Sequence, residues 1–241
     1  MRYNGVDLRE AHRALSVSKE IPPGMPDRSN EMVQGQGGEI LAASRISRGE
    51  YTVRVNVSGK TRQEAWEARA ALAAWADTKG QTAPLEPSLW PGKAYDAVVK
   101  SIDPPEFKFG FGVIKVAFDI PRPIAYDIIE DVRTGSKTIT MVVGGTSYCR
   151  PVIRQTMAAA ASRLTMAADG STFLVLNRTL KAGDVVTVDL KNESVLVNGE
   201  HAEASIDYTS TYWRPGFDPG PHTVTSSDSG AIEARWHNEW L

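Results

Sequence analysis

Hydrophobic and polar residues alternate strictly along residues 50–57. Tyr51, Val53 and Val55 are separated by single polar residues, and Val57 completes the series. A period of two is that of a β-strand with one buried and one exposed face. Residues 94–102 and 111–120 are further apolar runs of strand length, with a Pro-rich turn between them. The first half of the chain is therefore predicted to contain a sheet.

Residues 61–80 change to a helical period. Thr61 stands three residues before Glu64, which is the spacing of a capping box, and Lys79-Gly80 is a typical helix end. At helical spacing one face gathers Ala65, Ala68, Leu72, Trp75 and Ala76. The small alanines would let this face lie close to a sheet. Both Trp66 and Trp75 are expected to be packing anchors, because large aromatic side chains on an amphipathic helix usually face a core.

Residues 21–38, IPPGMPDRSNEMVQGQGG, break the pattern. Three prolines and four glycines stand among charged and amide residues, which is typical of an extended loop or arm. Connections this long usually reach a partner or stay mobile, and contact with a partner is the favoured interpretation. Residues 107–111 alternate phenylalanine with lysine or glycine, and two interpretations stay open: a strand with one aromatic face, or an apolar hairpin that docks on a neighbouring subunit.

Beyond Arg133 short apolar runs recur between turn signals such as Asn198-Gly199. The Asn198-Gly199 pair tolerates the positive φ of a tight reversed turn, so residues 186–190 are expected to fold against 194–198 and the chain to turn again. Strands at this spacing favour an all-β sandwich or jelly roll. We therefore expect two domains, residues 1–133 and residues 134–241.

Composition narrows the partners. The formal net charge is −2, so no overall field draws the chain to nucleic acid or to an anionic membrane, and any DNA contact should be weak. No apolar stretch approaches the length of a membrane span and no secretion signal is visible, so a soluble protein made in the cytoplasm is expected. The single cysteine, Cys149, excludes an internal disulfide and is expected to be a small buried hydrophobe.

Candidate chemistry is sparse. The four histidines show no metal-ligand spacing, and there is no G-x-S-x-G motif. The glycine clusters QGQGGEI and VVGGTSYCRPVI lead into strands, whereas a phosphate-binding loop must lead into a helix. The acidic pair Glu130-Asp131 is one of many that could be proposed for glycoside hydrolysis, and nothing selects it. No catalytic, cofactor-binding or metal-binding residue is therefore predicted, and the chain is not expected to be an enzyme.

The order of elements resembles a known family. It runs from RYNGVDL through the Pro/Gly arm, GGEIL, the Ala/Trp helix and FDIPRP to PGPHTV and IEARWHNEW. This order is similar to that of the distal tail proteins of long-tailed, non-contractile bacteriophages (siphophages). The resemblance implies a mainly β fold with one principal α-helix. Its N-terminal domain would be a tail-tube-like β-sandwich or barrel, and its C-terminal domain a galectin-like β-sandwich.

The same resemblance implies a structural virion protein at the tail tip, assembled in the host cytoplasm. Six copies would form a ring that joins the tail tube to the tail-tip hub or baseplate and surrounds the DNA channel. The implied partners are the chain itself, the tail tube protein and the hub protein, with tape measure and receptor-binding proteins as further candidates. DNA would pass only transiently, and we expect polar or acidic side chains along the channel, since a basic lining would hold phosphates.

A carbohydrate-binding β-sandwich for host-surface recognition is the alternative. It draws on the aromatic residues near the C-terminus, because sugar rings stack on exposed aromatic faces. These residues are Tyr212, Trp213, Trp236 and Trp240. Trp236 alternates in phase with Ile232 and Ala234, so it is expected in the core, and the positions of Trp213 and Trp240 stay open.

Overall fold

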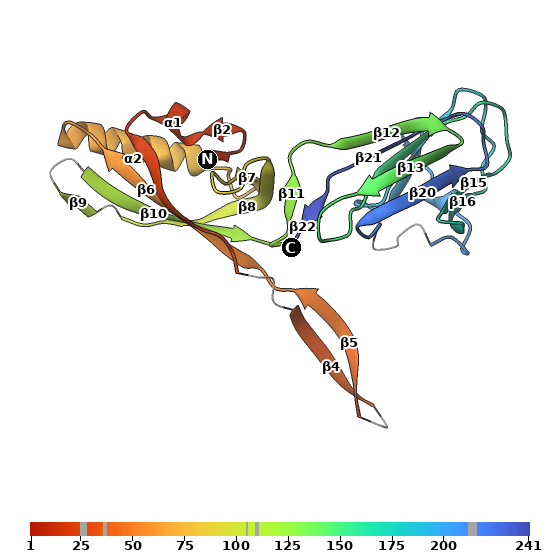
Figure 1. The fold of residues 1–241 in the computed structure, drawn as a ribbon, viewed down its shortest axis with the longest axis horizontal. Coiled ribbons are helices and arrows are strands. Elements are labelled where there is room, and N and C mark those ends of the chain that lie inside the picture. The colour runs from red at the N-terminus through yellow and green to blue at the C-terminus, as the bar shows by residue number, and fades with distance from the viewer. Residues whose placement is uncertain (25–27, 36–37, 105, 109–110, 212–215) are drawn as a thin grey trace. The chain divides into compact units, whose positions relative to one another are not determined.

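The structure is a computed structural model that describes residues 1–241 except 25–27, 36–37, 105, 109–110 and 212–215. The chain divides into two compact units, Met1–Tyr126 with Leu241, and Asp127–Trp240. The sequence places the domain boundary later, between residues 133 and 134. Strand β12 (Asp131–Ser136) crosses that position as one continuous strand of the second unit. The predicted fold class, mainly β with one principal helix, is confirmed (Figure 1).

The first unit is built on an antiparallel sheet. Its main path runs β2-β1-β7-β8-β10-β6-β3, with β9 paired to β10. The strands are β1 (Arg2–Tyr3), β2 (Val6–Asp7), β3 (Leu15–Ile21), β6 (Gly49–Ser58), β7 (Ala83–Glu86), β8 (Lys93–Ile102), β9 (Glu106–Lys108) and β10 (Phe111–Ile120). Strand β11 (Ala125–Asp127) reaches the division between the units, and a short helix α1 (Leu8–Ala11) follows β2.

Helix α2 (Arg62–Ala76) covers the apolar side of this sheet. The Thr61 hydroxyl accepts a hydrogen bond from the Glu64 amide, and Glu64 accepts one from the Lys60 amide, so the predicted helix start is confirmed. All five residues of the predicted helix face are buried. Trp75 donates to the carbonyl of Val6. The expectation for Trp66 is wrong: its side chain is 46% exposed, because it lies on the outer face of α2, where the Arg69 guanidinium stacks over its ring at 5.4 Å.

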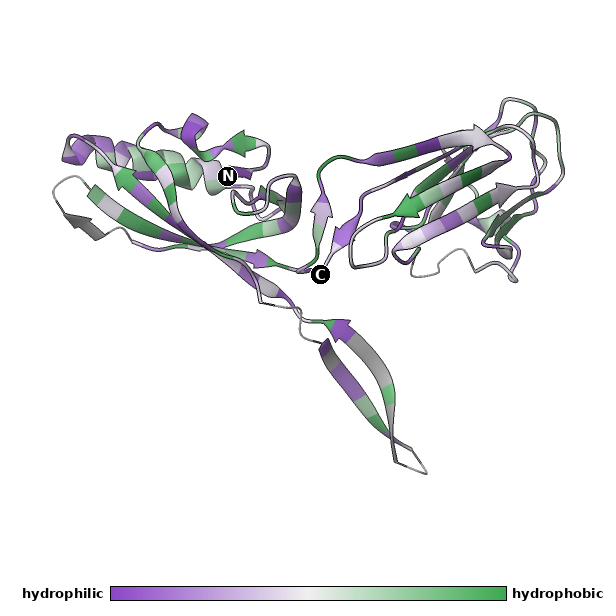
Figure 2. Ribbon diagram, viewed as in Figure 1, coloured by the Kyte–Doolittle hydropathy of each residue, from purple (hydrophilic) through white to green (hydrophobic). Residues whose placement is uncertain are grey.

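The sequence predicts an extended loop or arm here, and residues 28–46 form an arm of regular paired strands, not a loop. Strands β4 (Arg28–Gly35) and β5 (Gly38–Ile46) pair with each other and form a separate two-stranded sheet. The prolines that suggested a loop all precede β4, and three of the four glycines lie at its end or just beyond it. The intervening RSNEMVQ can therefore form a regular strand. The hairpin β4–β5, called the arm below, carries both hydrophilic and hydrophobic positions (Figure 2).

The second unit is a single hydrogen-bonded sheet in the order β16-β15-β20-β13-β12-β21-β14-β17-β18-β19. Besides β12, the sheet contains β13 (Thr138–Val143), β14 (Val152–Thr156), β15 (Leu164–Ala168), β16 (Ser171–Leu176), β17 (Val185–Asp189), β18 (Ser194–Val197), β19 (Glu200–His201), β20 (Gly220–Ser226) and β21 (Ala231–Trp236). The unit also includes a 3-10 turn at Glu203–Ser205 and strand β22 (Glu239–Trp240), which is not part of this sheet.

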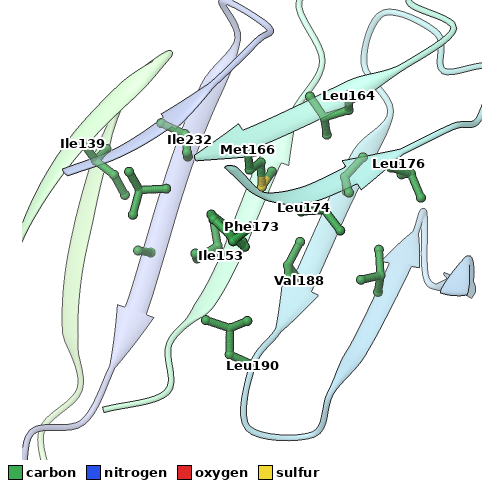
Figure 3. Packing of buried hydrophobic residues seen from close by; sticks show 14 of the residues in the cluster. Ile139, Ile153, Leu164, Met166, Phe173, Leu174, Leu176, Val188, Leu190 and Ile232 are labelled. Carbon is green, nitrogen blue, oxygen red and sulfur yellow. The ribbon is translucent and has the colours of Figure 1, made fainter. Parts of the chain in front are cut away.

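One hydrophobic core fills this second unit. Strands from both ends of the sheet order contribute to it, including Leu174 of β16 and Val188 of β17 (Figure 3). Asn198 and Gly199 have φ values of 53° and 85° and turn β18 back along β19, as the sequence predicted. Strands β17 and β18 also pair as predicted. The strands of this sheet thus enclose one apolar core. This is the β-sandwich arrangement expected for this half.

A buried amide, Asn238, joins distant parts of the second unit. Its Oδ1 accepts hydrogen bonds from the Gly144 amide at 2.8 Å and from Trp236 Nε1 at 3.1 Å. Its Nδ2 donates to Asp131 at 2.8 Å and to Asp127 at 3.1 Å. The side chain therefore uses two acceptor and two donor positions, its full capacity.

The Gly144-Gly145 turn is shaped by the same junction. A Cβ on Gly144 would lie 3.2 Å from the Asn238 side chain, and a Cβ on Gly145, whose φ is +83°, would overlap the carbonyl oxygen of Glu239. Thr146 and Ser147 also donate their amides to that carbonyl. These glycines permit a close approach of two backbones, which explains the cluster without any phosphate ligand.

We expect Asn238→Ala to destabilise the protein by about 2 kcal/mol or more, because it leaves the buried Trp236 N–H and the Gly144 N–H without their acceptor. Urea unfolding followed by tryptophan fluorescence measures this. The matched control is Asn192→Ala in an exposed turn, expected to change stability by less than about 1 kcal/mol. Equal effects of the two substitutions would contradict a special role for Asn238.

Candidate assembly surfaces

The arm exposes apolar side chains on both of its faces. Met32 and Leu41 oppose each other across the strand pair and are 50% and 53% exposed, and Val33, the next residue along β4, is 51% exposed. Successive residues of a strand point to opposite faces, so Met32 and Val33 lie on opposite sides of the arm. An isolated two-stranded hairpin is marginally stable in water. Both faces of the arm are thus surfaces that a protein partner could cover.

The base of the arm is tightly enclosed. Gly49, the first residue of β6 after the arm, lies so close to Pro23 and Pro123 that a Cβ would come within 2.8 Å and 2.9 Å of their Cβ atoms. The two prolines have little freedom to move away, because their rings fix φ. The point where the chain re-enters the sheet is therefore held by packing.

The second hairpin, β9–β10, is also partly apolar. Phe107 pairs with Gly112 in the backbone register, and Phe111 and Val113 are 48% and 37% exposed. The Phe107 side chain and residues 109–110 lie outside what the structure describes. Whether the phenylalanines form one strand face or a docking surface therefore stays open.

The residues considered for chemistry have structural roles. Cys149 is fully buried, and burial raises the pKa of its thiol to about 12. Glu130 lies 3.6 Å from Arg235, and Asp131 accepts from Asn238. The described residues contain no group of three or more His, Cys, Asp or Glu side chains that could hold a metal ion. Nor does any helix in this part of the chain have the length and apolarity to cross a membrane.

The described aromatic residues that supported carbohydrate binding take part in core packing or in hydrogen bonds. Trp236 is 2% exposed and lies in the core, as predicted. Trp240 is partly buried and donates its Nε1 to Asp127 at 3.0 Å. Tyr212 and Trp213 lie outside the described residues. Of the described members of this set, Trp236 is thus part of the core and Trp240 is hydrogen-bonded at its indole nitrogen.

His222 is held between two acceptors. Its Nδ1 is 2.7 Å from an Asp169 carboxylate oxygen and its Nε2 is 2.7 Å from the carbonyl oxygen of Asp218. A neutral imidazole has only one N–H, so both contacts are hydrogen bonds only when the ring is protonated. Partial burial lowers the pKa of His222, but these hydrogen bonds outweigh it, and the pKa lies above its ordinary value. The ring also lines a cavity of about 200 Å³ with Asp169 and Phe217.

Comparison with known proteins agrees with this architecture. Residues 144–240 match the family model described as siphovirus-type tail component, C-terminal domain. A comparison with curated protein sequences gives no match. Among solved structures, the Dit protein (gp 19.1) of phage SPP1, described as a hub of the adsorption apparatus in phages infecting Gram-positive bacteria, is similar with a TM-score of 0.80 at 14% identity. The similarity covers 100% of this chain and 98% of that one.

Two baseplate structures of phage p2, in the activated conformation with calcium and with strontium, are more distant. Their TM-scores are 0.47 and 0.46, each at 11% identity. They cover 93% and 92% of this chain and 90% of each matched chain.

The C-terminal match and the shared two-unit fold make this chain similar to structural components of siphophage tails. Residues 144–240 match the model of siphovirus-type tail components, and the chain as a whole has the fold of the SPP1 Dit protein. The resemblance stated from the sequence is confirmed.

We expect the His222 contacts to make the second unit more stable at low pH. Because the folded pKa is raised, this stabilisation is fully present below the unfolded value of about 6.5 and is lost as pH rises through the folded pKa. NMR titration of the His222 ring should show a lower pKa in Asp169→Asn than in the wild type. Asp207→Asn, elsewhere on the same unit, should leave it unchanged; an unshifted pKa in Asp169→Asn would refute the assignment.

Proposed function

We propose that six copies of the chain form a ring at the distal end of the tail tube, which joins the tube to the tail-tip hub or baseplate and surrounds the DNA channel. The observation that carries this proposal is the arm, with apolar side chains on both faces. A closed ring needs head-to-tail contacts between two different surfaces of each subunit, and an arm that enters a neighbour supplies such a contact. A specific contact needs about 1,000 Å² or more of buried area, which an extended hairpin can provide.

The two units have separate tasks in this proposal. The first unit, tail-tube-like in character, builds the ring and contacts the tail tube protein and the hub protein. The second unit, galectin-like, carries receptor-binding or baseplate proteins, and tape measure protein is a further candidate partner of the ring. The rings assemble in the host cytoplasm before the tail is complete. The chain works by shape and by contact, without catalysis and without a cofactor.

Carbohydrate recognition by the second unit is less well supported than assembly. Trp236 is in the core, and Trp240 donates a hydrogen bond to Asp127. Fewer aromatic residues are therefore left to support sugar binding. Binding on a glycan array by a full-length chain that stays monomeric would favour the carbohydrate-binding function over the ring.

We expect the triple substitution Met32→Ser, Val33→Ser and Leu41→Ser to weaken self-assembly at least tenfold. These changes remove apolar area from the contact, at about 25 cal/mol per Å², and leave both compact units intact. Light scattering over a concentration series should show a six-fold multiple of 26.3 kDa for the wild type and smaller species for the variant.

A matched control replaces three exposed apolar residues of the second unit, Ile129, Val142 and Tyr208, by serine. The control should assemble like the wild type. A wild type that stays monomeric through the whole series, or an arm variant that assembles normally, would overturn the proposed role of the arm.

A further inference from the structure

Three basic residues lie on one rung of the first sheet. Lys115 of β10 is paired with Arg54 of β6, and Arg54 is paired with Lys19 of β3. The three strands are neighbours in the sheet, and all three side chains are exposed. Side chains at paired positions point to the same face, and neighbouring strands are about 4.8 Å apart. The rung therefore places three cations within a span of about 10 Å.

The face that carries this rung is the one that α2 does not cover. The residues on either side of Arg54, Val53 and Val55, are both 1% exposed, and α2 contacts β6 on their side. Figure 1 shows α2 lying along β6. Because side chains alternate along a strand, Arg54 points away from the helix. The basic rung is thus open to a partner of the first unit.

The acidic side chains near the rung form no salt bridge with it in the described part of the chain. Glu50 and Asp119 on the same face are paired with each other in register, and both interact with Lys100, at 2.6 Å and 3.8 Å. Glu50 also interacts electrostatically with Lys115, and Asp103 lies beside Lys115, donating its amide to the Lys115 carbonyl at 2.9 Å. Within the described part of the chain, Lys19, Arg54 and Lys115 form no salt bridge. Like charges directly opposite each other destabilise a sheet. An anion bound across the strands would remove this repulsion.

The surroundings of the rung suit a phosphodiester backbone. The adjacent rung places Asn56 opposite Ser16, and Ser18 is exposed next to Lys19. Proteins contact DNA phosphates mainly through Arg and Lys together with Ser, Thr and Asn side chains. Phosphate contacts do not depend on the base sequence, and a channel through which any DNA passes needs contacts of this kind. The adjacent rung also includes Val113 of β10, which is paired with Asn56 and is 37% exposed.

We propose that Lys19, Arg54 and Lys115 form a contact site for the phosphates of passing DNA. This inference rests on the proposed ring, because the ring brings DNA to the chain. The contact is weak, since three cations per chain give a binding constant that falls steeply with salt, and DNA is released again. It also departs from the expectation of a purely polar or acidic channel, because each subunit contributes one basic rung.

The test measures binding of the full-length chain to a fluorescent 30-base-pair duplex of mixed sequence by anisotropy between 20 and 200 mM salt. The test variant carries Lys19→Gln, Arg54→Gln and Lys115→Gln. It should bind roughly tenfold or more weakly at low salt, and the slope of log K against log salt should become shallower by about 0.9 for each phosphate that the variant no longer neutralises. The control carries Lys137→Gln, Lys181→Gln and Lys191→Gln, three exposed lysines of the second unit, and changes the net charge equally.

The control should bind like the wild type. The proposal is overturned if the wild type does not bind the duplex at 20 mM salt, if test and control variants weaken binding equally, or if the rung binds poly-glutamate in preference to DNA, which would make an acidic protein segment the partner. Light scattering on the same samples separates this inference from the ring. A monomer that binds DNA through the rung contradicts the ring alone, and a ring whose DNA binding is unchanged in the test variant contradicts this inference alone.

Discussion

Burial of one face of β6 beneath α2 is the constraint on which the first unit depends. Tyr51, Val53, Val55 and Val57 must point toward the helix, because its small alanines and Leu72 bring it close to the strand. The same alternation sends Arg54 to the opposite face. The sheet neighbours β3 and β10 follow the register of β6, so their lysines reach the same rung. Core packing on one side thereby decides which charges meet a partner on the other.

In the second unit, polar side chains form hydrogen bonds between the first and the last residues of the unit. Asn238 connects Gly144, Trp236 and the acids Asp127 and Asp131, and Asp127 also accepts from Trp240. Buried polar groups must be paired, and a fully satisfied network makes one arrangement of the strands more favourable than others. Of the acidic pair considered for catalysis, Asp131 belongs to this network, and Glu130 lies 3.6 Å from Arg235.

Sequence periodicity correctly predicted those features that depend on residues close together in the chain. The cap at Thr61 and all five buried residues of α2 follow from helical spacing, and the Asn198-Gly199 turn follows from its backbone preference. The strands of the arm were missed because composition was weighed above alternation, although the prolines stand outside β4. Trp66 was misplaced since an aromatic residue can lie on either face of a helix. The basic rung joins residues 19, 54 and 115, and no sequence pattern gives the register that unites them.

The buried thiol of Cys149 has a practical consequence for following assembly. The chain contains one cysteine, which lies in the core of the second unit. Because the pKa of its thiol is raised to about 12, the thiol is hardly ionised at neutral pH and reacts poorly with reagents in solution. A cysteine introduced at an arm position would therefore react selectively with a dye or a crosslinker in the otherwise native chain. Distances between copies could then be read spectroscopically without first removing a native residue.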